Sequence, residues 1–338
     1  MALFYITGNN TGARGNGITG QALTWAQILG DYTPIQVTLV NSWQSYDYQK
    51  GDIVHLFGSG GVWFHDVAKQ LKEKECKVVW SPICDNIDSP NIQRMKAYMG
   101  SKRLQLFSYP MIRRLAYNLM DRVFVRSNYE KEYIKKAYGV NERIIDVIPL
   151  SMSYNNLDTI DTVHREKICL HISSIYQERK NVLRLIKAAK KYNFRLLLAG
   201  DKGSVSQFEP LEKEIEGNRN IEVLGYISEE QKVDLYKRAK VFALPSIKEG
   251  VGIVALDAAH FGCEIVITNI GGSKEYYADM AHQVNPLDVD SIGKAVIHAM
   301  GSGNGFQPKL SERVNKMYSQ QSIANDLYIA YNRIIEKK

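Results

Sequence analysis

Residues 244–277 read "LPSIKEGVGIVALDAAHFGCEIVITNIGGSKEYY". Glu249 stands in a loop that runs "EGVG" straight into an apolar segment, Asp257 follows eight residues later, and a "GG" pair comes at 271–272. If a helix begins near Gly252, Glu249 precedes it and Asp257 lies inside it, so both carboxylates face the same cleft. The segment therefore predicts a ligand that is bound by acidic side chains and by free backbone amides together.

The backbone of this segment favours a phosphate. The amides from Gly250 and Val251 to Gly252 and Ile253 point out of the predicted helix N-terminus, where the helix dipole attracts negative charge. Carboxylates accept hydrogen bonds from sugar hydroxyls. Together these groups suit a ligand with hydroxyls at both ends and a diphosphate between them.

Two further turns supply the remaining parts of such a site. "SSIYQERKNVLRLI" at 173–186 contains Arg179 and Lys180 at a strand-to-helix turn, where they can neutralise a leaving diphosphate. "EVLGYIS" at 222–228 offers an exposed turn at Gly225 and Tyr226, where a base can rest against the backbone.

Short apolar runs alternate with helical patterns along most of the chain, which predicts βαβ units, parallel sheets and an α/β fold. The expected strands lie at 2–8, 35–41, 52–58, 77–83, 121–127 and 145–151 in a first series, and at 167–174, 194–200, 221–227, 240–246 and 264–270 in a second.

A polar stretch separates the two series. We predict two doubly wound, Rossmann-like domains, 1–151 and 166–318, joined by a linker at 152–165 and facing a central cleft. The amphipathic segment at about 319–338 is expected to pack back on the first domain.

The bulk composition fits a globular protein without a membrane span. The 338 residues are 45% hydrophobic and 23% charged, with a net charge of +7 that favours anionic partners such as phosphates, nucleic acid or a lipid surface. Four scattered cysteines form no CxxC pair, which argues against zinc and disulfides and suits a cytoplasmic protein. The start "MALFYITGNNTG" has no basic region or long apolar run, so no signal peptide is expected.

Two short motifs admit several interpretations. "GNGITG" at 15–20 could be a dinucleotide loop, a flexible loop without ligand, or glycine-rich backbone amides near a phosphate or an acceptor. The third interpretation is favoured, and Gly17 is then expected to contact the donor. The dinucleotide interpretation is weakened because the first strand ends well before Gly15 and no acid follows the second strand. "DVD" at 288–290 could bind metal, but helix capping is favoured.

The segment 167–299 resembles the retaining glycosyltransferases of family GT4, which have the GT-B fold. The matching blocks are Pro245-Ser246, Glu249-Gly250, Gly252, Asp257-Ala258, Gly262, Gly271-Gly272 and Glu275, preceded by "VLGYISEEQKVDLYKRAKVFALPS". The first half resembles the family more loosely.

The resemblance implies roles for individual residues. Glu249 resembles the first acid of the family's E-x7-E motif, which contacts the donor sugar, and Asp257 takes the place of the second, which grips the ribose. Lys180 resembles the lysine that pairs with the diphosphate.

The sequence departs from the family at several positions. Asp257 is one methylene shorter than glutamate, and Ser174 stands where an arginine is usual, so that Arg179 can substitute for it. Glu264 stands where proline is common, and Cys84-Asp85 replaces a histidine-aspartate pair, which leaves Asp85 as the acceptor-side candidate.

The remaining titratable candidates have structural interpretations. Cys84 is expected to be a small buried residue, and His55, His171 and His260 are expected to be core histidines.

The resemblance implies transfer of a sugar from a nucleotide-diphosphate donor, UDP-sugar before GDP-sugar, with retention of configuration and without a metal or cofactor. Domain closure would exclude water, and polysaccharide or glycoconjugate assembly is the expected setting. A catalytically silent sugar-nucleotide or glycan-binding homologue and an NAD-dependent oxidoreductase remain as alternatives.

Residues 94–122 carry seven Lys/Arg against one acidic residue, interleaved with apolar and aromatic side chains. This pattern is typical of a segment lying on an anionic membrane, as with a lipid-linked acceptor, and equally of a helix pair whose apolar face is core. No nucleic-acid-binding module accompanies the charge.

Overall fold

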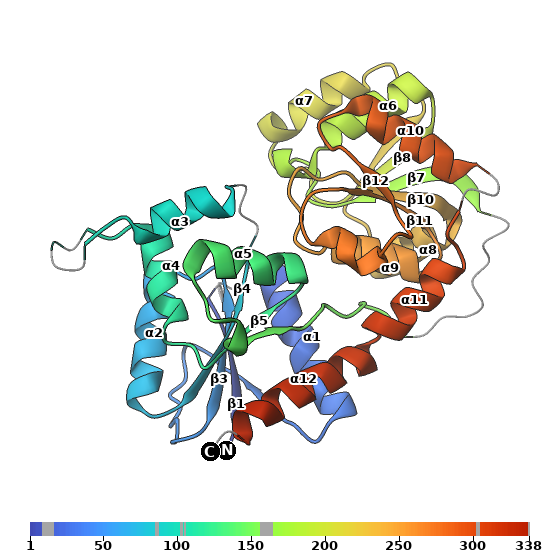
Figure 1. Cartoon of the computed structure of the whole chain (residues 1–338). Helices are drawn as coiled ribbons and strands as arrows, with labels where there is room; N and C mark the ends of the chain where they lie inside the picture. Colours follow the sequence, from blue (N-terminus) through green and yellow to red (C-terminus); the bar gives the residue numbers. More distant parts are fainter. Residues whose placement is uncertain are drawn as a thin grey trace. The chain divides into compact units, whose positions relative to one another are not determined.

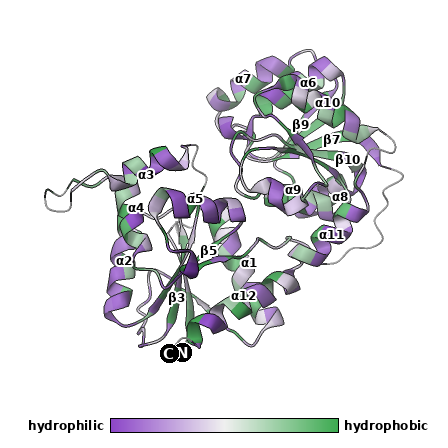
Figure 2. Ribbon diagram, viewed as in Figure 1, coloured by the Kyte–Doolittle hydropathy of each residue, from purple (hydrophilic) through white to green (hydrophobic). Residues whose placement is uncertain are grey.

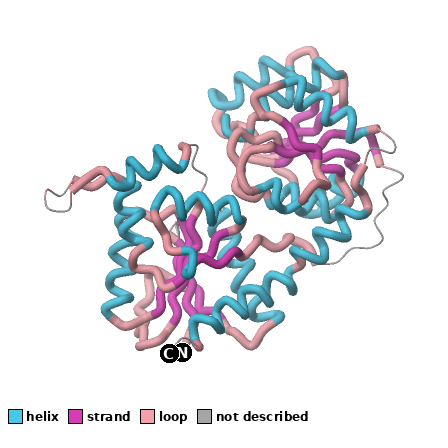
Figure 3. The backbone as a smooth tube through the Cα atoms, in the orientation of Figure 1, coloured by secondary structure: helices cyan, strands magenta, loops and turns pink. Residues whose placement is uncertain are grey.

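The computed structural model describes residues 1–8, 17–84, 88–101, 104, 106–155, 165–301 and 305–336. The chain forms two compact units, the first made of residues 1–150 and 320–338 and the second of residues 151–319. Each unit has a parallel sheet between layers of helices (Figure 3).

The sheet of the first unit has six parallel strands in the order β2-β1-β3-β4-β5-β6 (Figure 1). Its strands are β1 (Leu3–Thr7), β2 (Val37–Leu39), β3 (Ile53–Gly58), β4 (Lys77–Pro82), β5 (Arg122–Val125) and β6 (Ile145–Val147). Its helices are α1 (Gly17–Tyr32), α2 (Val62–Glu73), α3 (Pro90–Tyr98), α4 (Tyr109–Tyr117), α5 (Asn128–Tyr138), the short η1 (Glu142–Ile144) and α12 (Gln320–Ile335).

The second unit repeats this plan with the strand order β12-β11-β10-β7-β8-β9. Its strands are β7 (Glu166–Ile172), β8 (Arg195–Ala199), β9 (Ile221–Gly225), β10 (Ala239–Leu244), β11 (Glu264–Thr268) and β12 (His282–Val284). Its helices are η2 (Glu178–Lys180), α6 (Val182–Tyr192), α7 (Val205–Ile215), α8 (Glu229–Arg238), α9 (Ile253–His260), η3 (Ser273–Tyr277), α10 (Val289–Met300) and α11 (Lys309–Tyr318). The two parallel sheets confirm the predicted α/β, Rossmann-like fold.

The central strands are apolar because helices cover both faces of each sheet. β3 and β11 are buried along their whole length. In Figure 2 the hydrophobic colouring gathers on the strands and the hydrophilic colouring on the helices around them. Helix starts follow local capping rules: Ser127 caps α5, and Ser228 forms a capping box with Gln231 at the start of α8.

The last helix returns to the first unit, where α12 packs against α1. Tyr331 of α12 bonds through its hydroxyl to Nδ1 of His55 at 2.6 Å and to the hydroxyl of Tyr5 at 2.8 Å. The other ring nitrogen of His55 bonds to Ser81 Oγ at 2.8 Å. All of these side chains are buried, so the helix completes the polar pairing of the core.

The described residues of the predicted linker belong to the second unit, so the chain passes between units at 150–151 and 319–320. Arg165 donates to the carbonyls of Tyr236 at 2.8 Å and Ala239 at 2.7 Å. Residues 156–164 lie outside the described part of the chain.

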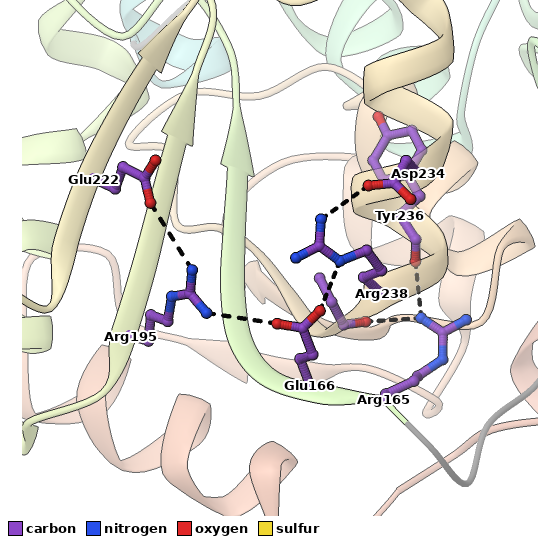
Figure 4. Close-up of polar contacts among 8 residues, drawn as sticks. Arg165, Glu166, Arg195, Glu222, Asp234, Tyr236 and Arg238 are labelled. Atoms are coloured by element: carbon purple, nitrogen blue, oxygen red, sulfur yellow. Dashed lines mark hydrogen bonds and ion pairs between the residues drawn. The ribbon is translucent and has the colours of Figure 1, made fainter.

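An ion-pair cluster surrounds the next residue, at the start of β7. Figure 4 shows Glu166 between Arg238, at 2.6 Å, and Arg195, at 3.5 Å. Arg195 also lies 3.9 Å from Glu222, and Arg238 lies 3.0 Å from Asp234. Because these side chains are 40–59% exposed, each pair contributes at most about 1 kcal/mol.

Candidate functional site

The candidate site lies at the carboxyl edge of the second sheet, where β7 and β10 are neighbours. In chain order the sheet runs 3-2-1-4-5-6, and β7 and β10 are its first and fourth strands, so the direction of winding reverses between them. Ligands of doubly wound sheets bind at this switch point. The loops after these two strands carry most of the sequence-predicted donor residues.

Lys180 and Glu249 form the central contact of the site. Lys180 Nζ lies 2.6 Å from Glu249 Oε2, and the side chains are 11% and 9% exposed. Ser246 Oγ also donates to Oε2, at 3.0 Å. The second carboxylate oxygen of Glu249, Oε1, has no protein partner among the described residues. It can therefore accept a hydrogen bond from a ligand hydroxyl.

Asn181 holds the loop of Lys180 against its neighbours. Its backbone is left-handed, with φ of 61°, a conformation that asparagine tolerates better than most residues. Its buried Nδ2 donates to the carbonyls of Pro245, at 2.9 Å, and Pro286, at 2.6 Å. The sequence analysis missed Asn181, although an asparagine directly before a helical pattern was an available signal. It placed Ser246 in a family block but gave it no role.

Helix α9 begins where the sequence predicts, with Gly252 at its N-cap in a left-handed conformation. Among the described residues, none accepts a hydrogen bond from the amides of Val251, Gly252 or Ile253. Val251 is buried and Ile253 is 36% exposed, so the amides lie at the border of the unit's interior. An anion at this point would gain hydrogen bonds and the helix dipole together.

The "GG" pair at 271–272 lets the turn after β11 lie close to the loop that carries Glu249. Gly271 has φ of 90°, and a Cβ atom there would lie 2.7 Å from the carbonyl oxygen of Glu249. Only glycine lets the turn after β11 approach the backbone this closely. The spacing of the acid and the glycine pair thus has a geometric cause.

The other predicted donor residues are less closely assembled. The Arg179 side chain is exposed, and its Nε donates to Gln177 Oε1 at 2.9 Å, so Lys180 alone of the two cations contacts Glu249. Gly225 ends β9 with φ of 70°, and Tyr226 beside it is 64% exposed. Ser174 is half-buried in the turn after β7.

Asp257 occupies a different environment from the one expected. Its side chain is 1% exposed, and both carboxylate oxygens accept hydrogen bonds from Ser153, one from the backbone amide and one from Oγ, each at 2.8 Å. In this structure the carboxylate fixes the segment after residue 150 to α9. A ribose contact by Asp257 stays a prediction and would need this pairing to rearrange.

Stability at Asp257 should depend on pH. Burial raises the pKa of this carboxyl from 3.8 to about 6, while the Ser153 hydrogen bonds oppose the rise. Between about pH 4 and 6 the folded state holds a proton that the unfolded state has lost. The contribution of Asp257 to the free energy of unfolding therefore falls by about 3 kcal/mol as pH rises through that window.

We expect Asp257→Asn to remove this pH dependence, because asparagine does not titrate. Urea unfolding of both proteins at several pH values measures it: the stability of the variant relative to wild type should increase by about 2–3 kcal/mol from pH 4 to pH 7. A difference that does not change with pH would contradict the expectation.

In the first unit, Gly17 is the exposed first residue of α1, whereas 15–16 and the acceptor-side candidate Asp85 lie outside the described residues. Cys84 is buried as expected, at 5% exposure.

The expected core histidines are confirmed. His171 bonds to the carbonyl of Ala243 and to Ser173 Oγ, and His260 bonds to Asn315, while His55 is paired as described above. Burial lowers the pKa of His171 to about 4, which keeps its ring neutral.

Helix capping is confirmed for the "DVD" motif, since Asp288 accepts from the amide of Asp290 at the start of α10. In the described ranges, no group of three or more His, Cys, Asp or Glu side chains is placed to hold a metal ion. Nor is any described helix long and apolar enough to cross a membrane.

Comparison with known proteins assigns the second unit to a class. Residues 158–317 match the family model described as Glycosyl transferases group 1. A glycosyltransferase of Methanocaldococcus jannaschii, itself uncharacterized, is 25% identical over 93% of this chain and 82% of its own length. O-antigen chain mannosyltransferase B of Escherichia coli is 29% identical over 37% of this chain. The aligned part covers 34% of that relative's own length.

Among solved structures, HepE of Anabaena in complex with UDP has a TM-score of 0.71 and 13% identity, covering 98% of this chain and 100% of that one. This likeness shows the fold, which is GT-B. The second unit carries a glycosyltransferase group 1 domain, and the matches support a glycosyltransferase enzyme.

Proposed function

We propose that this protein is a retaining glycosyltransferase that moves a sugar from a nucleotide-diphosphate donor to an acceptor hydroxyl without a metal ion. The observation that carries the proposal is the Lys180–Glu249 contact beside the N-terminus of α9, inside the group 1 domain. It places a cation, an accessible carboxylate oxygen and helix amides together at the switch point of the sheet.

Each part has a task in the transfer. Lys180 and the α9 amides stabilise the diphosphate as the bond from the sugar anomeric carbon to the phosphate oxygen breaks. Glu249 Oε1 accepts a hydrogen bond from a donor-sugar hydroxyl and so positions the ring. Arg179, which is exposed, can turn toward the diphosphate once a donor is bound.

Retention follows if the acceptor attacks from the face that the diphosphate leaves. The acceptor oxygen then bonds to the anomeric carbon while its proton passes to the departing phosphate oxygen. No covalent intermediate with the protein is required in this scheme. The leaving group serves as the base, and the protein contributes positioning and positive charge.

The donor is proposed to be a UDP-sugar, with a GDP-sugar as the alternative. The exposed turn at Gly225 and Tyr226 would hold the base, and the fold shared with HepE, solved with UDP, favours uracil. The first unit would bind a glycan or lipid-linked acceptor in polysaccharide or glycoconjugate assembly, the setting that the O-antigen relative's name indicates.

Thermal denaturation with UDP, GDP, ADP, CMP and NAD, each with and without Mg²⁺, tests the donor site. A ligand at about 100 times its Kd stabilises by about 2.7 kcal/mol, which raises Tm by several degrees. We expect a shift with UDP that does not need Mg²⁺. A shift with NAD alone would contradict the proposal, and no shift with any nucleotide would favour the silent glycan-binding homologue.

We also propose that the first unit lies on an anionic membrane surface on the cytoplasmic side. Arg113 and Arg122 are buried, so the exposed part of the predicted segment 94–122 ends near Tyr109, and it extends back to the exposed Ile92; we call 92–109 the relevant segment. Arg94 and Arg114 stack on Tyr98. The exposed apolar side chains of this segment are Ile92, Met95, Tyr98, Met99, Leu104, Leu106, Phe107 and Tyr109.

A vesicle flotation experiment checks this surface. The protein should bind phosphatidylcholine vesicles that contain phosphatidylglycerol, and the double change Met99→Glu with Phe107→Glu should abolish binding because it adds charge to the contact. Val205→Glu is the control, since Val205 is 86% exposed in the second unit. Equal binding of both variants would contradict the proposal.

A further inference from the structure

A pocket opens at the carboxyl ends of β1 and β2 in the first unit, far along the sequence from the donor residues. Its volume is about 450 Å³, within the range of about 300–1,000 Å³ that small-molecule sites occupy. A second pocket, beside Gly58 and Trp63, holds only about 130 Å³. The residues that shape the larger pocket include Thr7, Thr19, Leu23, Leu39, Asn41 and Trp43.

Trp43 is the unusual member of this pocket, which we call the Trp43 pocket. Its side chain is 92% exposed, whereas Trp25 and Trp80 are at most 1% exposed. An exposed aromatic ring that adjoins other exposed apolar side chains marks a candidate interaction site. Leu23 and Leu39, at 50% and 45%, add exposed apolar surface to the same pocket.

The backbone beside this indole is held in place although the ring itself is uncovered. Asn41 Oδ1 accepts from the amide of Trp43 at 3.0 Å, and the amide of Asn41 donates to the hydroxyl of Tyr46 at 2.9 Å. The ring of Tyr46 packs in turn on Phe4 of β1, with centroids 6.1 Å apart. The indole is therefore presented from an ordered turn, which lowers the entropic cost of binding.

The chemistry of the lining selects a class of ligand. None of the described residues that line it carries a charge, which favours a neutral ligand. Two threonine hydroxyls and an asparagine amide accompany the exposed aromatic face. An aromatic face is electron-rich and attracts the weakly positive C–H groups of a pyranose, while hydroxyls and amides pair with sugar hydroxyls.

We propose that the Trp43 pocket binds a neutral pyranose ring of the glycan acceptor, which stacks on the indole of Trp43. The identification of this sugar as part of the acceptor rests on the proposed transferase function. The binding itself requires only the first unit. It extends the proposal by naming both the part of the acceptor that is recognised and the residue that recognises it.

Fluorine NMR of the full chain labelled with 5-fluorotryptophan tests it. The chain has four tryptophans, and Trp43→Phe and Trp63→Phe assign the two exposed signals. The probes are the methyl glycosides of glucose, galactose, mannose and N-acetylglucosamine, raised to about 100 mM because single-ring affinities are in the millimolar range. Uridine is added in a parallel titration.

We expect a saturable shift of the Trp43 signal with at least one glycoside, while the signals of buried Trp25 and Trp80 stay in place. Asn41→Ala keeps the indole but removes a polar partner and the bond to the Trp43 amide, so it should weaken binding by about tenfold, equivalent to about 1.4 kcal/mol. Tyr129→Phe, on an exposed ring outside the pocket, should change nothing.

Two outcomes would overturn the inference: no saturable shift of the Trp43 signal with any glycoside, or a saturable shift with uridine alone. Tm shifts with UDP on the same sample report the donor site of the second unit. A glycoside response without a Tm shift from either UDP or GDP would contradict the proposed function and leave the sugar pocket supported. A nucleotide response without a glycoside response would support the donor site and overturn the sugar pocket.

Discussion

Replacing Glu249 by alanine is expected to lower the rate of sugar transfer by about 10²- to 10³-fold, the usual cost of removing one group that positions or stabilises the reacting centre. Oε1 of this residue has no protein partner among the described residues, and Oε2 holds Lys180. The measurement is UDP released from UDP-glucose, UDP-galactose and UDP-N-acetylglucosamine. Binding of UDP itself should survive, because the contact is with the sugar.

Two comparisons separate lost chemistry from lost folding. Removing one partner of a buried ion pair can destabilise by about 3–5 kcal/mol, so Tm of the variant is measured first, and Glu249→Gln is added as the isosteric change. Glu178→Ala alters an exposed acid in the neighbouring turn and should keep full activity. Full activity in Glu249→Ala would show that the assignment of the central residue is wrong.

Replacing Gly200 by alanine should destabilise the second unit by about 4 kcal/mol, combining backbone strain with overpacking. Gly200 follows β8 with φ of 120°, and an added Cβ would lie 1.9 Å from the carbonyl oxygen of Ser173. Its amide donates to the carbonyl of Gly225 at 2.7 Å. The expected fall in Tm is about 8–16 °C for a unit of this size.

Gly217→Ala is the matched control for this clash. Gly217 also has a positive φ, 74°, but a Cβ there meets nothing within 4 Å. It should therefore cost only about 1–2 kcal/mol from the left-handed backbone. Equal losses in the two variants would show that backbone strain alone, and not the approach to Ser173, makes glycine necessary at residue 200.

The fold could be predicted because its signals are local. Buried parallel strands are continuous apolar runs, so 52–58 and 264–270 anticipate β3 and β11 closely. The strand missed, β12, has three residues, "HQV", and only Val284 is buried. A run that short carries no periodic signal, and its place at the sheet edge is set by β11 beside it.

The candidate site also contains features that local spacing predicts and contacts that it does not. Glu249 and the start of α9 follow from short-range spacing. The Lys180–Glu249 contact joins two different loops, and the sequence analysis did not predict it; the roles of both residues toward a donor stay predictions. The pairing of Asp257 with Ser153 joins residues 104 positions apart. No local pattern indicates such a contact, because it depends on where the tertiary structure returns the chain.

The return of α12 to the first unit also fixes an order of events during synthesis. Residues 151–319 are translated between the two parts of the first unit, so the second unit is complete before the first. At about 5–20 residues per second, Tyr331 is synthesised roughly 14 to 55 s after His55. During that interval the nascent first unit exposes the apolar and polar core surface that α12 later covers.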